Sequence, residues 1–183
     1  MKKIILVDGN NILFRSFYAT AYQGVIMKNS KGFPTNALYG FINMMNKIIK
    51  EENPSYILVA FDKGKTFRHD KYDSYKAGRM EMPDELKMQF PKAKEVLDAM
   101  GIKHFEIDNY EADDIIGSTT RFFPNIEFDI LSSDRDLLQL INDTTHVLLM
   151  KSGISEIRHM DEKQLWEDFQ LTPTQIIDFK GLS

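Results

Sequence analysis

The chain has 183 residues, of which 43% are hydrophobic and 27% charged, and its formal net charge is −4. This length and composition fit one globular domain that buries roughly 70% of its unfolded surface, and they exclude a disordered or low-complexity chain. The absence of cysteine excludes disulfides, thiolate zinc sites and cysteine nucleophiles. The longest apolar run, 56–61, is far shorter than the ~20 residues that span a bilayer. We therefore expect a cytoplasmic protein without a membrane partner.

Short apolar runs alternate along the chain with amphipathic stretches of helical period. This alternation predicts an α/β fold with three layers, in which a mostly parallel sheet is covered by helices on both faces. The predicted elements, in chain order, are a strand at 3–7, a helix opened by Pro34, a strand at 56–61, a helix at 84–100, a strand at 103–107, a helix at 111–123, a strand at 127–131, a helix at 134–141, a strand at 146–150, a returning strand at 154–159, and two helices that start at Asp161 and at Thr172.

One of these helices has a clear apolar face. The spacing of its apolar residues predicts that the helix opened by Pro34 carries Leu38, Phe41, Ile42, Met45, Ile48 and Ile49 on one face.

Aspartates follow three of the predicted strands. Asp8 and Asp62 directly follow the first two apolar runs, and Asp134 comes three residues after Leu131. Because ligands of such sheets lie beyond the carboxyl ends of the strands, we expect these side chains to meet at one edge. Four further acids stand close to helix starts and can join the same edge: Glu111, Asp113, Asp114 and Asp136.

A structural role competes with a functional one for several of these acids. Acidic residues at helix starts often serve as caps, and Ser133 and Asp136 have the spacing of a capping box. Glu111 and Asp113 share a direction only if Glu111 precedes the helix proper. Capping and function are equally plausible for Asp134 and Asp136 taken alone, whereas the joint pattern favours a site. Crowded carboxylates repel one another unless cations join them, and all-oxygen ligands suit Mg²⁺ or Mn²⁺, so we expect two such ions.

A basic segment follows Asp62. Residues 63–79 carry six Lys or Arg and two Asp, a local charge of +4, with aromatic residues between them. Lysine and arginine bind phosphates, and a tyrosine stacks on an unpaired base. Alone, such a segment is more often a solvated loop, but its position beside the acids favours a nucleic-acid contact.

Five stretches together resemble the 5′-nuclease domain of bacterial DNA polymerase I and its relatives, the phage 5′ nucleases and flap endonucleases. They are LVDGNNILFRSFYA (6–19), FDKGKTFRHDKYDSYKAGR (61–79), YEADDIIG (110–117), SSDRDLLQL (132–140) and LTPTQIIDFKGL (171–182). The resemblance implies a PIN-like fold with a basic helical arch, and a metal-dependent nuclease acting on DNA 5′ ends and 5′ flaps and on RNA primers.

The resemblance also implies roles for individual residues. Asp8, Asp62, Glu111 and Asp113 would hold a first metal, Asp134 and Asp136 a second, and Asp114 would lie beside both. Arg68, Lys76 and Arg79 would contact phosphates in the arch, and Tyr72 or Tyr75 would stack on the single strand. Asp8, Asp62, Asp113 and Lys76 would act in catalysis, with Lys76 offsetting charge on the phosphate.

Domain organisation follows from the same resemblance. We expect a single monomeric domain over 1–183, with an arch insertion at about 63–100. The family continues into a helix–three-turn–helix that binds duplex DNA and is missing after Ser183. A polymerase domain would be a partner in the same or a separate chain. The alternatives are a PIN-type ribonuclease, a truncated, non-catalytic DNA-structure-binding module and, more distantly, a phospho-acceptor receiver domain.

Overall fold

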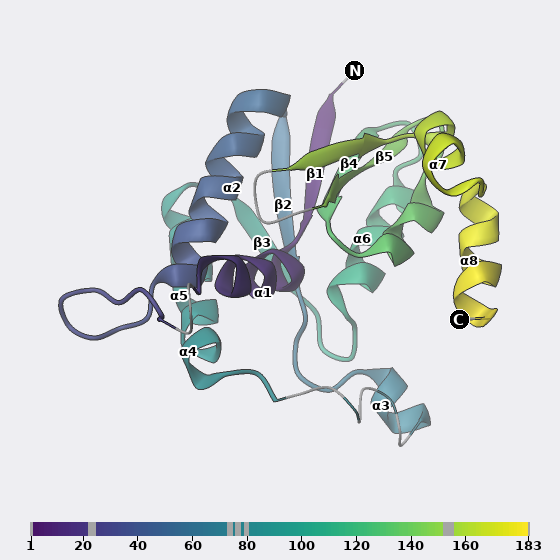
Figure 1. Cartoon of the computed structure of the whole chain (residues 1–183). Helices are drawn as coiled ribbons and strands as arrows, with labels where there is room; N and C mark the ends of the chain where they lie inside the picture. The colour runs from purple at the N-terminus through teal and green to yellow at the C-terminus, as the bar shows by residue number, and fades with distance from the viewer. Residues whose placement is uncertain are drawn as a thin grey trace.

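In a computed structural model of the chain, the described residues form one six-stranded sheet between two layers of helices (Figure 1). The structure describes residues 2–21, 25–72, 75, 78, 81–151 and 156–182. The strand order is β3-β2-β1-β4-β5-β6, with β1 to β5 in parallel pairs and β6 antiparallel to β5. The predicted α/β class is confirmed. The strands are β1 (Lys3–Asp8), β2 (Tyr56–Phe61), β3 (Lys103–Glu106), β4 (Glu127–Ser132), β5 (Thr145–Met150) and β6 (Ile157–Met160).

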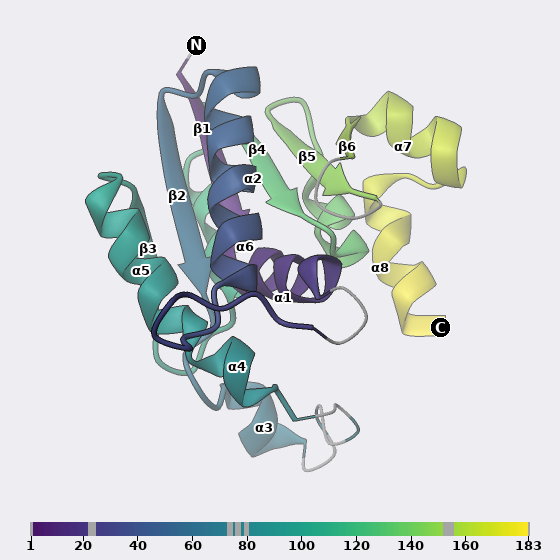
Figure 2. The same ribbon diagram turned by 60° about the vertical axis from the view of Figure 1, so that its left-hand side comes forward.

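Helices cover both faces of the sheet (Figures 1 and 2). One layer consists of α1 (Gly9–Thr20), α2 (Asn36–Glu52), α4 (Asp84–Lys87) and α5 (Gln89–Ala99). The other consists of α6 (Ala112–Phe122), the 3₁₀ helix η1 (Arg135–Leu140), α7 (Glu162–Phe169) and α8 (Pro173–Leu182). The short helix α3 (Phe67–Lys71) lies apart from both layers, beyond the carboxyl ends of β1 and β2. No helix in the described part of the chain combines the length and apolarity needed to cross a membrane.

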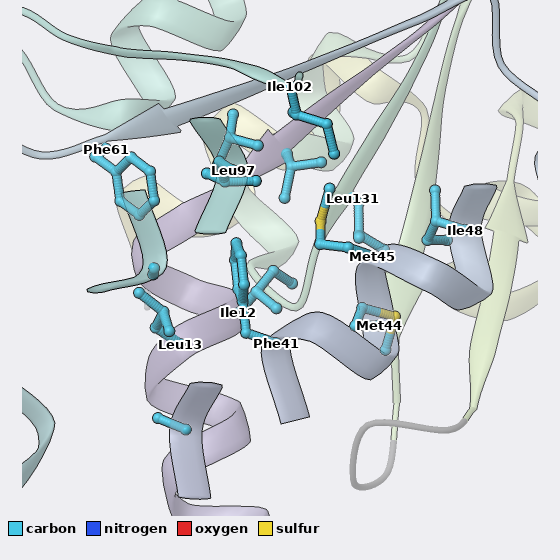
Figure 3. Close-up of a cluster of buried hydrophobic side chains, with 14 of the residues drawn as sticks. Ile12, Leu13, Phe41, Met44, Met45, Ile48, Phe61, Leu97, Ile102 and Leu131 are labelled. Carbon is cyan, nitrogen blue, oxygen red and sulfur yellow. The ribbon is translucent and has the colours of Figure 1, made fainter. Parts of the chain in front are cut away.

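Alternation along the strands divides the core in two. Ile5 and Val7 of β1 pack with α1, α2 and α5, whereas Leu6 between them packs with α6, because successive strand side chains point to opposite faces. Figure 3 shows the first of these clusters, in which Phe41 and Met45 of α2 meet Ile12 of α1. Each large apolar side chain that is fully buried there stabilises the fold by about 1.5–3 kcal/mol.

The buried face of α2 differs from the predicted one. The buried hydrophobic residues are Ala37, Phe41, Met44, Met45 and Ile48. Leu38 is partly buried and packs against the same core, Ile42 is partly buried, and Ile49 is 39% exposed, so the assignment of Ile49 to the apolar face toward the core was wrong. The helix packs against both α1 and the sheet, and the position of α1 rotates the contact toward Ala37 and Met44.

Other boundaries also differ. The predicted helix at 84–100 is two helices that meet at Met88, and the helix at 134–141 is a 3₁₀ helix. The returning strand, predicted at 154–159, is β6 from Ile157 to Met160, and residues 152–155, which include the first two predicted positions, lie outside the described residues. Helix α1 was not predicted, although Ile12, Leu13, Ser16 and Phe17 have helical spacing and are buried.

The expected insertion at 63–100 contains two different parts. Leu86, Ala93 and Leu97 are fully buried in the core, so α4 and α5 belong to the helical layer that covers the sheet. Helix α3 buries no residue. Among the described residues of the expected insertion, the element that stands apart from the sheet is therefore α3.

Helices α1 and α2 cross so closely that a glycine is required at their contact. A Cβ atom at Gly40 would lie 2.7 Å from Cβ of Ser16 and 3.2 Å from its Cα. We therefore expect Gly40→Ala to destabilise the protein by about 1–3 kcal/mol, measured by urea unfolding. Gly117→Ala in α6 is the matched control, because its Cβ would meet Leu140 at an ordinary 3.6 Å. It should be neutral or stabilise by up to ~1 kcal/mol. Equal stability of the two variants would contradict the close crossing.

Candidate metal centre

Acidic side chains gather at the carboxyl edge of the sheet. Asp8 ends β1, Asp62 follows β2 and Asp134 follows β4, and these three strands are neighbours. Strand β2, the next along the chain, pairs with one side of β1, and β4 pairs with the other side. The carboxyl edge at β1 is therefore the topological switch point, where α/β sheets bind ligands. A cavity of about 300 Å³ opens there, and its acidic lining residues are Asp8, Asp62, Glu111, Asp113, Asp134 and Asp136.

Asp8 is the most deeply buried acid of this cavity, with 6% of its surface exposed. Its carboxylate accepts hydrogen bonds from the backbone N–H of Asn11 at 3.0 Å and from Oγ of Ser132 at 3.0 Å. The pKa of Asp8 is raised to about 7, chiefly by burial; the charges of Asp62 and Asp134 contribute to this rise, and the two hydrogen bonds oppose it. Asp8 therefore caps α1 and also faces the cavity.

Asparagine and serine side chains position the acidic edge, a role that was not predicted from the sequence for any of them. Asn10 Oδ1 accepts the N–H of Asp62 at 3.1 Å. Asn11 Oδ1 accepts the N–H and the hydroxyl of Ser133 at 2.9 and 2.8 Å, and thereby joins the first turn of α1 to the residue that follows β4. The signal was present in the sequence, because amide and hydroxyl residues stand next to Asp8 and Asp134 where strands end.

The first turn of α6 brings Glu111 and Asp113 together. Glu111 is the N-cap of α6 and therefore precedes the helix proper, which is the condition for Glu111 and Asp113 to point in the same direction. Glu111 is 8% exposed. Asp62 fixes the same turn by accepting the N–H of Ala112 on Oδ1 at 2.7 Å. Glu111 thus both caps a helix and lines the cavity, so the two roles that the sequence left open coexist.

Asp113 has the most perturbed acidity of this site. Its pKa is raised to about 8, chiefly by desolvation, and the charges of Asp8, Asp134, Asp62 and Glu111 contribute to this rise. A carboxylate placed among four others without a cation is costly to ionise. The acids of the cavity therefore form an anionic site that favours cations.

Asp114 lies in a different environment from the other six acids. It lines an adjoining cavity of about 310 Å³, and both of its carboxylate oxygens accept hydrogen bonds from the Arg68 guanidinium at 2.7 and 2.8 Å. It also accepts the N–H of Glu111 at 3.0 Å. Arg68, expected to contact phosphate, is therefore paired with an acid in this structure.

The two acids near η1, Asp134 and Asp136, have different partners. Asp134 caps η1 by accepting the N–H of Asp136 at 2.9 Å, so the cap is Asp134 and the capping box predicted from Ser133 is wrong. Asp136 pairs with Nζ of Lys180 on α8 at 2.8 Å, a contact that the sequence analysis missed. The carboxylate of Asp136 raises the pKa of Lys180, because it stabilises the ammonium form.

The aromatic residues of the basic segment are also in different places. Tyr75 lines the acidic cavity, and its hydroxyl lies 3.2 and 3.1 Å from the two carboxylate oxygens of Glu111. Tyr72 is 63% exposed. Lys76 and Arg79 lie outside the described residues, so their predicted contacts stay predictions.

The donor set of the cavity fits hard divalent cations. All of its charged groups are carboxylates, and the raised pKa values of Asp8 and Asp113 indicate a site that lacks positive charge. Within the described residues, no group of three or more acidic or histidine side chains is arranged to hold one ion by itself. Mg²⁺ suits such a site, because it commonly keeps several waters and takes only one or two carboxylates from the protein.

The fold and this edge define a doubly wound α/β domain with an acidic centre at its switch point. Residues 3–170 match the family described as "5′-3′ exonuclease, N-terminal resolvase-like domain". The chain belongs to this family.

Curated relatives and solved structures agree with the family assignment. The chain is 46% identical to DNA polymerase I of Streptococcus pneumoniae strain R6, over 99% of this chain and 21% of the relative. It is 43% identical to DNA polymerase I of Bacillus subtilis, over 99% of this chain and 20% of the relative. The chain thus spans about a fifth of the length of these relatives.

Two solved structures share the fold. T5 5′-exonuclease with bound zinc ions matches with a TM-score of 0.69 and 21% identity, over 98% of this chain and 65% of the other. Flap endonuclease-1 from Methanococcus jannaschii matches with a TM-score of 0.59 and 18% identity, over 96% of this chain and 62% of the other.

Proposed function

We propose that the chain is a metal-dependent 5′ nuclease that removes nucleotides from DNA 5′ ends and cuts 5′ flaps, including RNA primers. The observation that carries this proposal is the cavity of six carboxylates beside a basic segment, in a chain of the 5′-3′ exonuclease family. We also propose a polymerase domain as partner, because the curated relatives that match nearly all of the chain are DNA polymerase I proteins.

In this proposal Asp8, Asp62, Glu111 and Asp113 hold one Mg²⁺ or Mn²⁺, directly or through its bound waters, and Asp134 and Asp136 belong to a second ion, with Asp114 nearby. Bound ions of this kind lower the pKa of a coordinated water and offset charge on a phosphate. Asn10, Asn11 and Ser132 keep the carboxylate edge rigid, since their hydrogen bonds fix Asp8, the Asp62 backbone and the end of β4. Such preorganisation lets the acids act without rearranging during the reaction.

The basic segment supplies attraction for the substrate. A cavity of carboxylates repels a polyanion, so cationic groups are needed at its mouth. We propose that Lys76 offsets charge on the scissile phosphate, that Arg68 and Arg79 contact neighbouring phosphates, and that Tyr72 or Tyr75 stacks on an unpaired base.

The proposal is tested with a 5′-labelled flap duplex and the purified chain, in Mg²⁺, in Mn²⁺ and in chelator. Release of the flap in either metal, and its loss in chelator, is the expected result. A matched duplex without a flap or a free 5′ end serves as the control substrate. Cleavage that persists in chelator would overturn metal dependence.

A binding module is the second candidate. The described acids are not arranged to coordinate a single ion with three or more side chains, and Lys180 pairs with Asp136. Flap binding that survives chelation, with no cleavage in any metal, would favour this candidate. Cleavage of RNA alone would favour a PIN-type ribonuclease instead.

A further inference from the structure

Residues 63–72 contact the loop before α6 at several points. Lys63 Nζ lies 3.0 Å from a carboxylate oxygen of Asp108, and the N–H of Phe67 donates to the carbonyl oxygen of Asn109 at 3.1 Å. The rings of Phe67 and Tyr110 meet edge-on with centroids 6.0 Å apart. These contacts dock α3 against the entrance of α6.

The hydroxyl of Tyr75 lies on the chelating side of Glu111, that is, on the side where both carboxylate oxygens can bind one cation. It lies at nearly equal distances, 3.2 and 3.1 Å, from both carboxylate oxygens, and Oγ1 of Thr66 adds a contact to one of them at 3.4 Å. A cation that binds both oxygens of a carboxylate lies in the same direction. Tyr75 is supported from behind by an edge-on contact with His69, whose Nδ1 accepts the N–H of Thr66 at 3.1 Å.

Arg68 covers the chelating side of Asp114 in the same way. Its two terminal nitrogens bind the two carboxylate oxygens at 2.7 and 2.8 Å, a forked pair that also covers the chelating side. Tyr75 and Arg68 both line the 310 Å³ cavity, together with the acids that they contact. Donors from one segment thus satisfy two neighbouring carboxylates of the first turn of α6.

We propose that this α3–α6 contact (Thr66, Arg68 and Tyr75 on Glu111 and Asp114) competes with divalent cations, so that metal binding loosens α3 from α6. The ring of Tyr75 then becomes available to a nucleic-acid strand only after metal has bound, which couples the two binding steps. This inference rests on the proposed metal site, and it makes Tyr75 a residue that controls access to that site.

The first test measures Mn²⁺ affinity by calorimetry without DNA. Tyr75→Phe keeps the ring and removes the hydroxyl that covers Glu111, so Mn²⁺ should bind about tenfold more tightly than to wild type. Tyr39→Phe is the matched control, because Tyr39 is 53% exposed on α2 and lines neither acidic cavity, and its affinity should equal that of wild type. Weaker binding by Tyr75→Phe would mean that the hydroxyl positions Glu111 for the ion, and equal binding that it does not compete; either result overturns the proposal.

The second test follows amide hydrogen exchange of residues 66–72. Exchange should become faster when Mg²⁺ is added to wild type, because the contacts that dock α3 are lost. Arg68→Lys keeps the charge but not the fork, so its exchange should already be fast without metal. Unchanged or slower exchange in Mg²⁺, while calorimetry shows that the ion binds, overturns the coupling. Absence of any metal binding to wild type would instead overturn the proposed function.

Discussion

Replacing Asp113 by Asn is expected to lower 5′-flap cleavage by at least ~100-fold while the fold is retained. Substitution of a group that only supports a metal ligand commonly costs 10- to 100-fold, and loss of a ligand should cost no less. Asp113 projects into the shared cavity from the first turn of α6, among four other carboxylates. The change is nearly isosteric, so circular dichroism should be unchanged.

The measurement is the initial rate of flap release in saturating Mn²⁺, together with calorimetric Mn²⁺ affinity. Asp143→Asn, which removes an exposed acid from the turn before β5, is the control and should cleave like wild type. An Asp113→Asn protein that cleaves at the wild-type rate would remove Asp113 from the proposed metal site.

Without metal, the free energy of unfolding should fall as pH rises from about 5 to 8.5. The pKa of Asp8 is raised to about 7 and that of Asp113 to about 8, so over this range the folded protein keeps protons that the unfolded chain has already lost. The contribution of these groups is complete below the ordinary aspartate pKa and is lost as pH rises through their folded values. We expect a total loss of about 2–4 kcal/mol, below the sum of the two shifts because the carboxylates interact.

Urea unfolding at pH 5.5, 7 and 8.5, in chelator and in Mg²⁺, measures this effect. Mg²⁺ should reduce the fall, since the ion stabilises the charged carboxylates of the folded state. The double variant Asp8→Asn and Asp113→Asn should show a flatter profile in chelator and exceed wild type at pH 8.5. Stability of wild type that rises with pH in chelator would contradict the burial of these two acids.

Much of the architecture was predictable because it depends on local pattern. The runs that end at Val7 and Phe61 are apolar at nearly every position, as strands of a parallel sheet are when helices bury both faces. Helix α1 was not predicted because its short apolar pattern directly follows β1 and because its N-cap, Asp8, was interpreted only as a ligand. The buried face of α2 was misplaced because Ile49 is apolar yet turned away from α1 and the sheet.

The candidate site was predictable as a set of acids but not as a set of contacts. Strand ends and helix starts indicated which acids would face one edge, and six of the seven do line one cavity. The sequence could not indicate that Arg68 would pair with Asp114, or Lys180 with Asp136, because these partners are 46 and 44 residues apart. Charged side chains at such separations meet only after the layers have packed.

The sequence by itself determined the alternation of strands and helices, the acidic edge and the family. Each of these depends on short local patterns: the period of apolar residues, acids placed at strand ends and helix starts, and short motifs. The tertiary structure alone decided which oxygens face the cavity, which acids are buried enough to hold protons, and which donors cover Glu111 and Asp114. The physical reason is that burial and pairing are properties of the packed molecule. Desolvation at Asp8 and Asp113 arises only when β1, β4 and α6 converge, and no local pattern encodes it.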